Sequence, residues 1–158
     1  MLNKTALDIG VYYYDINDLI LYRNGGYVNR EDAEHYGVEF RVNSSYFNNH
    51  NLNFSYAYSH ARDSEDENLE FIPLHKFKIE DTFSITKDLN AYLGYQYLSS
   101  RYSSNSATYS DEQMKLDDYH LVDTQLSYKF SNSINGRVGI KNIFDEAYEW
   151  KYGYPTEG

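Results

Sequence analysis

The sequence predicts an all-β fold: an antiparallel up-and-down meander of about seven strands that forms part of a larger transmembrane β-barrel. Three observations lead to this prediction. Polar and apolar residues alternate with a period of two in segments of roughly ten residues. Short and long connections alternate along the chain, and 19 of the 158 residues are Tyr. The apolar ring and polar hydroxyl of Tyr suit the boundary between lipid and water.

Each predicted strand has an apolar face and a polar face. In the segment 51–59, for example, Leu, Phe and Tyr occupy every second position, and Asn, Ser and Ala occupy the others. The predicted strands are, in order, 7–13, 36–46, 51–59, 74–85, 89–102, 122–130 and 134–140. Asp81 is an exception, because it falls among the apolar residues of its strand and the alternation gives no reason for it.

The connections between the predicted strands are of two kinds. Polar three-residue turns lie at 48–50, 86–88 and 131–133, whereas long polar connections span about 23–34, 61–72, 103–118 and the tail after Glu146. Outer-membrane barrels have short periplasmic turns and longer extracellular loops. The first strand is therefore expected to run outward, and the tail is expected to end outside.

An extracellular tail also predicts that the barrel continues beyond this sequence. Both ends of a complete barrel are expected on the periplasmic side, so a final descending strand is expected after Gly158. A sheet of about seven strands would leave two open edges, and lipid does not tolerate unpaired backbone groups. No export signal precedes the first predicted strand, so the sequence is also expected to begin inside a longer protein.

Composition excludes several classes of protein. The 14 basic and 24 acidic residues give a net charge of −10, which argues against a nucleic-acid partner. The sequence has no Cys, so disulfides and thiolate chemistry are excluded. It contains no run of about 18 apolar residues, so no transmembrane helix is predicted.

Four groups of segments resemble, in order, the β-barrel domain of TonB-dependent outer-membrane receptors, and the resemblance covers nearly the whole chain. The segments are Tyr27-Val28-Asn29 with Tyr36-Gly37-Val38-Glu39; Pro73-Leu74-His75-Lys76; Tyr119-His120-Leu121-Val122-Asp123; and Asn142-Ile143-Phe144-Asp145 with Tyr148 and Gly153-Tyr154-Pro155. The resemblance implies that residues 1–158 are the C-terminal portion of the barrel domain, without its plug domain. It also implies a place in the outer membrane of a Gram-negative bacterium.

The resemblance implies a function for the parent protein. Receptors of this family take up ferric siderophores or similar large, scarce nutrients such as haem or cobalamin. The ligand binds extracellular loops and the plug, and TonB, which contacts the plug, supplies the energy. The expected partners of this chain are therefore outer-membrane lipid, such a nutrient and, through the absent plug, TonB. Enzymatic activity and a cofactor are not expected.

Arg and aromatic residues in the expected extracellular loops are the candidate ligand contacts. Such side chains suit an anionic, ring-bearing siderophore through charge, stacking and cation–π contacts. The alternative interpretation is an aromatic girdle at the membrane boundary for Tyr and Trp, and ordinary solvated charges for Arg. The candidates are Arg23, Tyr27, Arg30, Arg101, Tyr102, Tyr109, Trp150 and Tyr152.

No metal site or catalytic site is predicted. The five His residues lack metal-ligand spacing such as H-E-x-x-H. The acidic segment 63–67 offers oxygen ligands of the kind that Ca²⁺ uses, but its pattern differs from an EF-hand loop. No G-x-S-x-G nucleophile motif is present. A dyad of His120 and Asp123 is the nearest approach to a hydrolase, and the resemblance makes Asp123 a structural residue that faces the barrel lumen.

Two alternatives remain at this level. A small complete barrel with a structural or adhesin role requires an even number of strands and a periplasmic C-terminus. A soluble all-β binding domain requires its apolar residues to point inward. Expression of the chain without detergent separates these alternatives from the barrel-wall prediction, which expects no folded, water-soluble monomer. A well-folded monomer, measured by sedimentation and circular dichroism, would contradict it.

Overall fold

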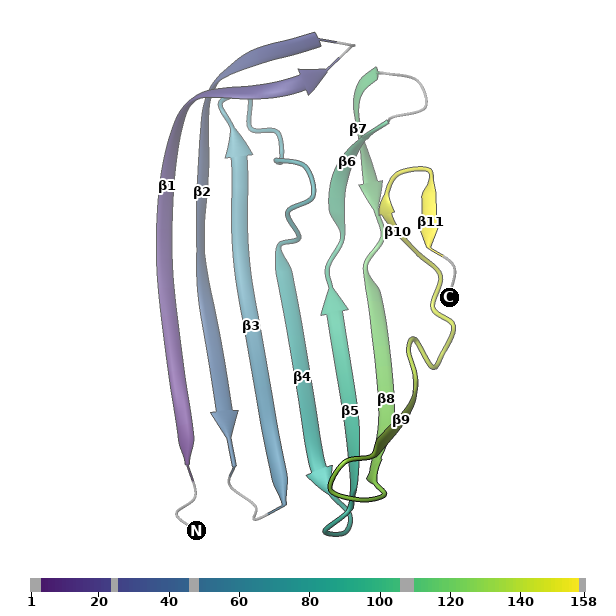
Figure 1. The fold of residues 1–158 in the computed structure, drawn as a ribbon. Helices are drawn as coiled ribbons and strands as arrows, with labels where there is room; N and C mark the ends of the chain where they lie inside the picture. Colours follow the sequence, from purple (N-terminus) through teal and green to yellow (C-terminus); the bar gives the residue numbers. More distant parts are fainter. Residues whose placement is uncertain (1–3, 24–25, 46–48, 106–109, 157–158) are drawn as a thin grey trace.

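A computed structural model describes residues 4–23, 26–45, 49–105 and 110–156 of the chain. No helix in this part of the chain is long and apolar enough to span a membrane. Seven antiparallel strands form one sheet, in the order β1-β2-β3-β4-β5-β8-β9 (Figure 1). Its strands are β1 (Thr5–Arg23), β2 (Gly26–Ser44), β3 (His50–Asp63), β4 (His75–Ser84), β5 (Leu89–Leu98), β8 (Tyr119–Lys129) and β9 (Asn135–Ile140). The predicted meander of about seven strands is confirmed.

The sheet has two different ends. Residues 85–88 and 131–133 form tight turns at one end, close to the start of the chain; we call it the turn end (Figure 1). At each turn a backbone amide, that of Ile85 or Phe130, donates across the turn to a carbonyl oxygen, at 2.9 and 3.0 Å. The long connections lie at the opposite end, the loop end. The short turns predicted at 86–88 and 131–133 are confirmed, whereas residue 48 of the turn predicted at 48–50 lies outside the described residues.

The register of the strands separates two faces of the sheet. Paired residues of neighbouring strands point to the same face, so the register defines rows of side chains across the sheet. One row of the apolar face consists of Leu7, Val42, Phe54, Ile79, Tyr95 and Val122. The adjacent row of the polar face consists of Asp8, Arg41, Ser55, Lys78, Gln96 and Leu121. This separation gives the sheet one apolar surface and one polar surface, as a membrane barrel requires.

The sheet is a single layer, and its apolar face is uncovered. Ile9 in β1 is 64% exposed, and similar side chains in β5, β8 and β9 are also exposed. In the described part of the chain, the only large apolar side chains that are buried are Leu116 and Tyr119, both at the loop end. A soluble domain would pack a second layer against such a face. The structure therefore contradicts the soluble alternative, which requires inward-pointing apolar residues.

Asp81, the exception in the predicted alternation, has a partner on the neighbouring strand. It lies on the apolar face of β4, and its Oδ2 is 2.6 Å from Nδ1 of His50 at the start of β3. The His50 ring also stacks with Phe83, at 5.3 Å between centroids. The pair explains how a carboxylate is accommodated close to lipid, because a buried charge requires a hydrogen-bonded partner.

Tyr and His side chains gather on the apolar face toward the loop end. The Tyr56 hydroxyl lies 2.9 Å from Nδ1 of His75, and the Tyr95 hydroxyl lies 2.8 Å from Nδ1 of His120. The ring of Tyr97 also packs on that of His120, at 4.9 Å. Amphipathic rings at this position are typical of the aromatic girdle where a barrel leaves the membrane. The girdle interpretation thus applies to these Tyr residues.

The predicted long loop at 23–34 is wrong, because β1 and β2 remain paired up to Arg23 and Gly26. The hairpin extends beyond the other strands and bends at the loop end (Figure 1). Asp18 has a left-handed backbone conformation, with φ of +58°, but the register is the same on both sides of it. Its carboxylate accepts a hydrogen bond from the Asn29 side chain at 3.0 Å. Where β1 and β2 extend beyond the lipid, neither face of the hairpin has to be apolar. The sequence there has no period of two, so these parts of the strands could not be predicted from it.

Two more hairpins correct the predicted loops and strand limits. The segment predicted as a loop at 103–118 contains β6 (Arg101–Asn105) and β7 (Ser110–Leu116), and the tail contains β10 (Tyr148–Lys151) and β11 (Tyr154–Thr156). The predicted strand 89–102 is interrupted after Leu98, and regular pairing of the last long strand ends at Ile140. These short strands lie beyond the girdle, where polar and apolar residues do not alternate, so the sequence did not indicate them.

The assignment of faces predicts opposite effects of Arg at two positions. Ile9→Arg places a charge on the apolar face and is expected to destabilise the inserted receptor by about 2–4 kcal/mol if it lies near the middle of the bilayer. Asn53→Arg, on the polar face, is expected to have little effect. Urea unfolding of the full receptor in lipid vesicles measures both. Equal destabilisation by the two variants would contradict the assignment.

Candidate functional site at the loop end

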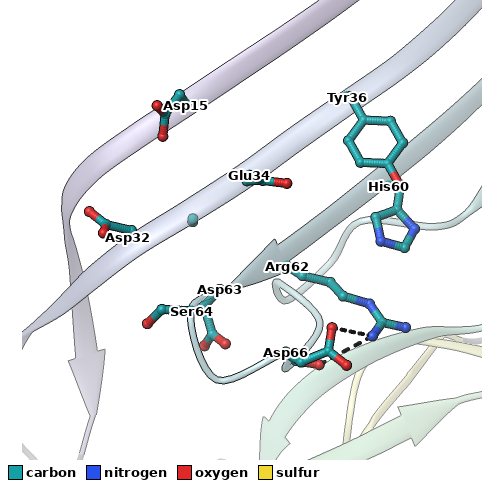
Figure 2. A pocket seen from close by; sticks show the side chains of 10 residues that line it. Asp15, Asp32, Glu34, Tyr36, His60, Arg62, Asp63, Ser64 and Asp66 are labelled. Carbon is teal, nitrogen blue, oxygen red and sulfur yellow. Dashed lines mark hydrogen bonds and ion pairs between the residues drawn. The ribbon is translucent and has the colours of Figure 1, made fainter.

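An acidic pocket at the loop end is a poor place for an anionic ligand. It has a volume of about 380 Å³ and is lined by Asp15, Asp32, Ala33, Glu34, Tyr36, His60, Arg62, Asp63, Ser64 and Asp66. Figure 2 shows the guanidinium of Arg62 turned toward Asp66. Asp66 accepts a hydrogen bond from Arg62 and raises the pKa of this guanidinium, which lies beyond the membrane-spanning part of β3. The remaining carboxylates leave the pocket negative.

Asp63, the first residue of the acidic segment 63–67, stabilises the turn of that segment. Oδ1 of Asp63, a buried side chain, accepts hydrogen bonds from the backbone amides of Glu65 and Glu67, at 3.1 and 3.0 Å. Among the described residues no group of three or more His, Cys, Asp or Glu side chains is placed to hold a metal ion. The observed role of Asp63 is therefore to shape the loop.

A small core holds the elements of the loop end together. Arg101, at the start of β6, is only 4% exposed, and its guanidinium lies 5.3 Å from the centre of the Tyr119 ring. Tyr119 stacks on Tyr148 of β10, at 4.3 Å between centroids. Leu116 at the end of β7 and Ser103 in β6 are buried beside them. Burial raises the pKa of the Tyr119 hydroxyl, and the charge of Arg101 opposes this shift.

The β6–β7 hairpin supports the long connection between β3 and β4. The amide of Phe71 donates to the carbonyl oxygen of Tyr102 at 2.8 Å. The Gln113 side chain donates to the carbonyl oxygen of Asn68 at 2.7 Å, and Ser104 donates to the carboxylate of Glu70 at 3.3 Å. Three contacts thus fix segment 68–71 on β6 and β7.

The β10–β11 hairpin lies on the same support. The Arg101 guanidinium donates to the carbonyl oxygen of Glu149, and the amide of Tyr152 donates to the Ser103 hydroxyl at 3.5 Å. The hairpin is closed by its own side chains, because the Glu149 carboxylate accepts from the amide of Gly153 at 3.2 Å. Arg101 therefore connects β6 with the tail of the chain.

These contacts bring two exposed aromatic rings together. Phe71 is 41% exposed and Trp150 is 59% exposed, and their rings lie 6.5 Å apart at an angle of 29°. Phe71 adopts a left-handed backbone conformation with φ of +62°, which is unfavourable for a bulky side chain. Strained residues held in place by surrounding contacts are concentrated at ligand-binding sites. We call Phe71 and Trp150 the aromatic pair.

The structure places the predicted ligand contacts in two groups. Arg101, Tyr102, Trp150 and Tyr152 come together around β6 and β10, and Tyr27 lies apart near the tip of the β1–β2 hairpin, 80% exposed. Tyr109 and the side chains of Arg23 and Arg30 lie outside the described part of the structure. Ligand contact at all eight positions stays a prediction.

Sequence reasoning missed three residues of this site. Phe71 lies in a connection without periodicity, so no pattern distinguished it. Tyr119 and Tyr148 belong to the quoted motifs, but the motifs do not say that the two rings stack. Their contact joins residues far apart in the sequence, and only the fold brings them together.

Comparisons with known proteins agree with this architecture. Residues 2–143 match the family model described as "TonB dependent receptor-like, beta-barrel". The vitamin B12 transporter BtuB of Vibrio cholerae serotype O1 is 32% identical over 149 residues, which cover 92% of this chain and 24% of the transporter. The chain thus spans about a quarter of the length of the curated relatives that it matches.

Solved structures of similar fold come from larger receptors. The ferric yersiniabactin uptake receptor FyuA from Yersinia pestis is 17% identical, with a TM-score of 0.79 over 93% of this chain and 23% of its own. The copper transporter OprC is 19% identical, with a TM-score of 0.81 over 98% of this chain and 26% of its own. At these identities the likeness establishes the fold alone.

The strain at Phe71 predicts a difference between two substitutions. Phe71→Gly and Phe71→Ala both remove the ring, but only Gly adopts a positive φ at little cost. The Gly variant is expected to hold segment 68–71 more firmly, by roughly 1 kcal/mol. Hydrogen exchange of these amides in the full receptor measures the difference. Equal protection in the two variants would contradict strain at this position.

Proposed function

Because this chain belongs to the TonB-dependent receptor-like β-barrel family, we propose that it forms wall and loops of an outer-membrane receptor for active uptake of a large, scarce nutrient. Members of this family lie in the outer membrane of Gram-negative bacteria. The relatives that match this chain are transporters and receptors rather than enzymes. The proposed role of the chain is to form lipid-facing wall and to present ligand-facing loops.

The aromatic pair is the observation that carries this proposal. Phe71 and Trp150 expose neighbouring rings at the loop end, and the backbone of Phe71 is held in a strained conformation by β6. Exposed rings on a rigid support favour the binding of a ligand that itself carries flat rings or conjugated groups. Ferric siderophores with aromatic chelating groups, haem and cobalamin all have such groups.

Two nutrient classes are the leading candidates. A ferric siderophore suits the combination of aromatic and Arg side chains predicted from the sequence, and receptors for such ligands have the same fold at low identity. Cobalamin is favoured by a different observation, since the relatives that are 32% identical are vitamin B12 transporters. The aromatic pair suits either ligand.

The proposal extends to the rest of the parent protein. Residues 1–158 are proposed to be the C-terminal portion of the barrel domain, with the plug domain elsewhere in the parent. TonB is proposed to contact the parent through that plug. Family membership supports both proposals. The seven-stranded open sheet supports the first, since its edges at β1 and β9 call for further strands in lipid.

Binding to the purified full receptor tests the proposed function. Fluorescence titrations with a ferric catecholate, a ferric hydroxamate, haemin and cyanocobalamin are expected to identify one class that binds with micromolar affinity or better. Uptake of that probe by cells is expected to require an energised inner membrane. Absence of binding by all four probes would contradict the proposal as stated for these nutrients.

Removal of the aromatic pair is expected to weaken ligand binding. Phe71→Ala and Trp150→Ala each remove one stacking surface, worth about 0.5–1.5 kcal/mol, which corresponds to roughly a 2- to 10-fold rise in Kd. Phe130→Ala is the matched control, because Phe130 is also an exposed ring but lies at the turn end. If Phe71→Ala and Trp150→Ala bind the ligand with unchanged affinity, or if Phe130→Ala loses as much affinity as they do, the aromatic pair is not part of the binding site.

A further inference from the structure

Arg101 is a buried cation for which the described part of the chain supplies no anion. Its side chain is 4% exposed. One terminal nitrogen, Nη2, donates to a neutral acceptor, the carbonyl oxygen of Glu149. The other, Nη1, is shielded from solvent and has no hydrogen-bond partner among the described residues. No carboxylate of the described residues forms an ion pair with it.

The nearby aromatic groups do not supply the missing charge. The Tyr119 ring offers a cation–π contact at 5.3 Å, but burial raises the pKa of its hydroxyl, so it stays neutral at physiological pH. The carboxylate of Glu149 is engaged with the amide of Gly153 within its own hairpin. With one neutral acceptor among the described residues, the buried guanidinium keeps the two N–H donors of Nη1 unpaired and its charge uncompensated, which is costly.

The β10–β11 hairpin, which accepts a hydrogen bond from Arg101, is a small element. Its strands have four and three residues. Besides the bond from Arg101 itself, the hairpin contacts the rest of the chain through the stacking of Tyr148 on Tyr119, the ring contact of Trp150 with Phe71 and the long bond from Tyr152 to Ser103. Movement of the hairpin would release the Arg101 guanidinium from Glu149, the residue next to Trp150 of the aromatic pair.

From this arrangement we propose that Arg101 is an oxyanion-binding residue, whose partner is a carboxylate, phenolate or phosphate oxygen from outside the described chain. The planar guanidinium suits such groups, because it donates two parallel hydrogen bonds. Two sources have this chemistry: the nutrient, or a carboxylate from the rest of the receptor. The first source rests on the proposed function, and the second does not.

The test uses the full receptor in detergent and three variants. Arg101→Gln removes the charge at similar size. Arg101→Met also removes the charge but keeps the apolar packing on Tyr119. Arg62→Gln is the control, since Arg62 is a half-exposed Arg at the same end of the sheet and already has a partner in Asp66. The readouts are the Tm without ligand, the change in Tm with inorganic phosphate, and the Kd of whichever nutrient probe binds the wild type.

The two sources give different results. If the nutrient supplies the oxyanion, phosphate raises the Tm of the wild type but not of the Arg101 variants, and their Kd for the probe rises roughly 10- to 100-fold. Their Tm without ligand is then unchanged or higher. If the receptor supplies a carboxylate, the Arg101 variants lose Tm without ligand, well beyond Arg62→Gln, and the probe binds as before.

The proposal is overturned if the Arg101 variants match the control in Tm, in response to phosphate and in Kd. Should Arg101→Gln fail to fold, Arg101→Met decides. A folded Met variant with wild-type stability, phosphate response and affinity would reduce Arg101 to a packing residue. If no nutrient probe binds the wild type, the proposed function fails for those nutrients. The Tm values with and without phosphate still show whether Arg101 binds an oxyanion.

Discussion

The fold depends on one constraint: a chain in lipid must satisfy its own backbone hydrogen bonds. The ladder from β1 to β9 does so across seven strands, with every neighbour antiparallel. Because side chains of a strand alternate between faces, the same ladder produces an apolar face for lipid and a polar face for the lumen. Even Asp81 fits this constraint, since His50 on the next strand satisfies one of its oxygens.

The site lies where the chain leaves the lipid and the constraint on its backbone hydrogen bonds ends. Beyond the row of Tyr and His side chains, the strands no longer border lipid, and a small core replaces the long ladder. Arg101, Tyr119 and Leu116 are buried in this core, and segment 68–71 and the β10–β11 hairpin attach to it. The wall therefore provides rigidity. The loop end provides exposed rings and a buried Arg side chain that no carboxylate of the described residues pairs.

The sequence predicted the features that contact with lipid imposes, namely the strands of the sheet and their direction. It did not predict the contacts at the loop end. The period of two located the strands of the sheet, and the contrast between short and long connections gave their direction. Around 23–34 the residues do not alternate between polar and apolar, although β1 and β2 stay paired there, so two paired strands resembled a loop. The aromatic pair and the burial of Arg101 depend on contacts between segments 30 to 80 residues apart, roughly at 71, 101 and 150, which no local pattern encodes.

The most direct test of the central claim is the membrane exposure of single side chains along β3. The sequence has no Cys, so a spin label can be attached at each position from 51 to 59 in turn, in a full receptor without other reactive Cys. In lipid vesicles, oxygen accessibility is predicted to peak at Leu52, Phe54, Tyr56 and Tyr58 and to fall at the positions between them. Uniform accessibility, or peaks at the alternate positions, would contradict the assignment of this sheet as a barrel wall.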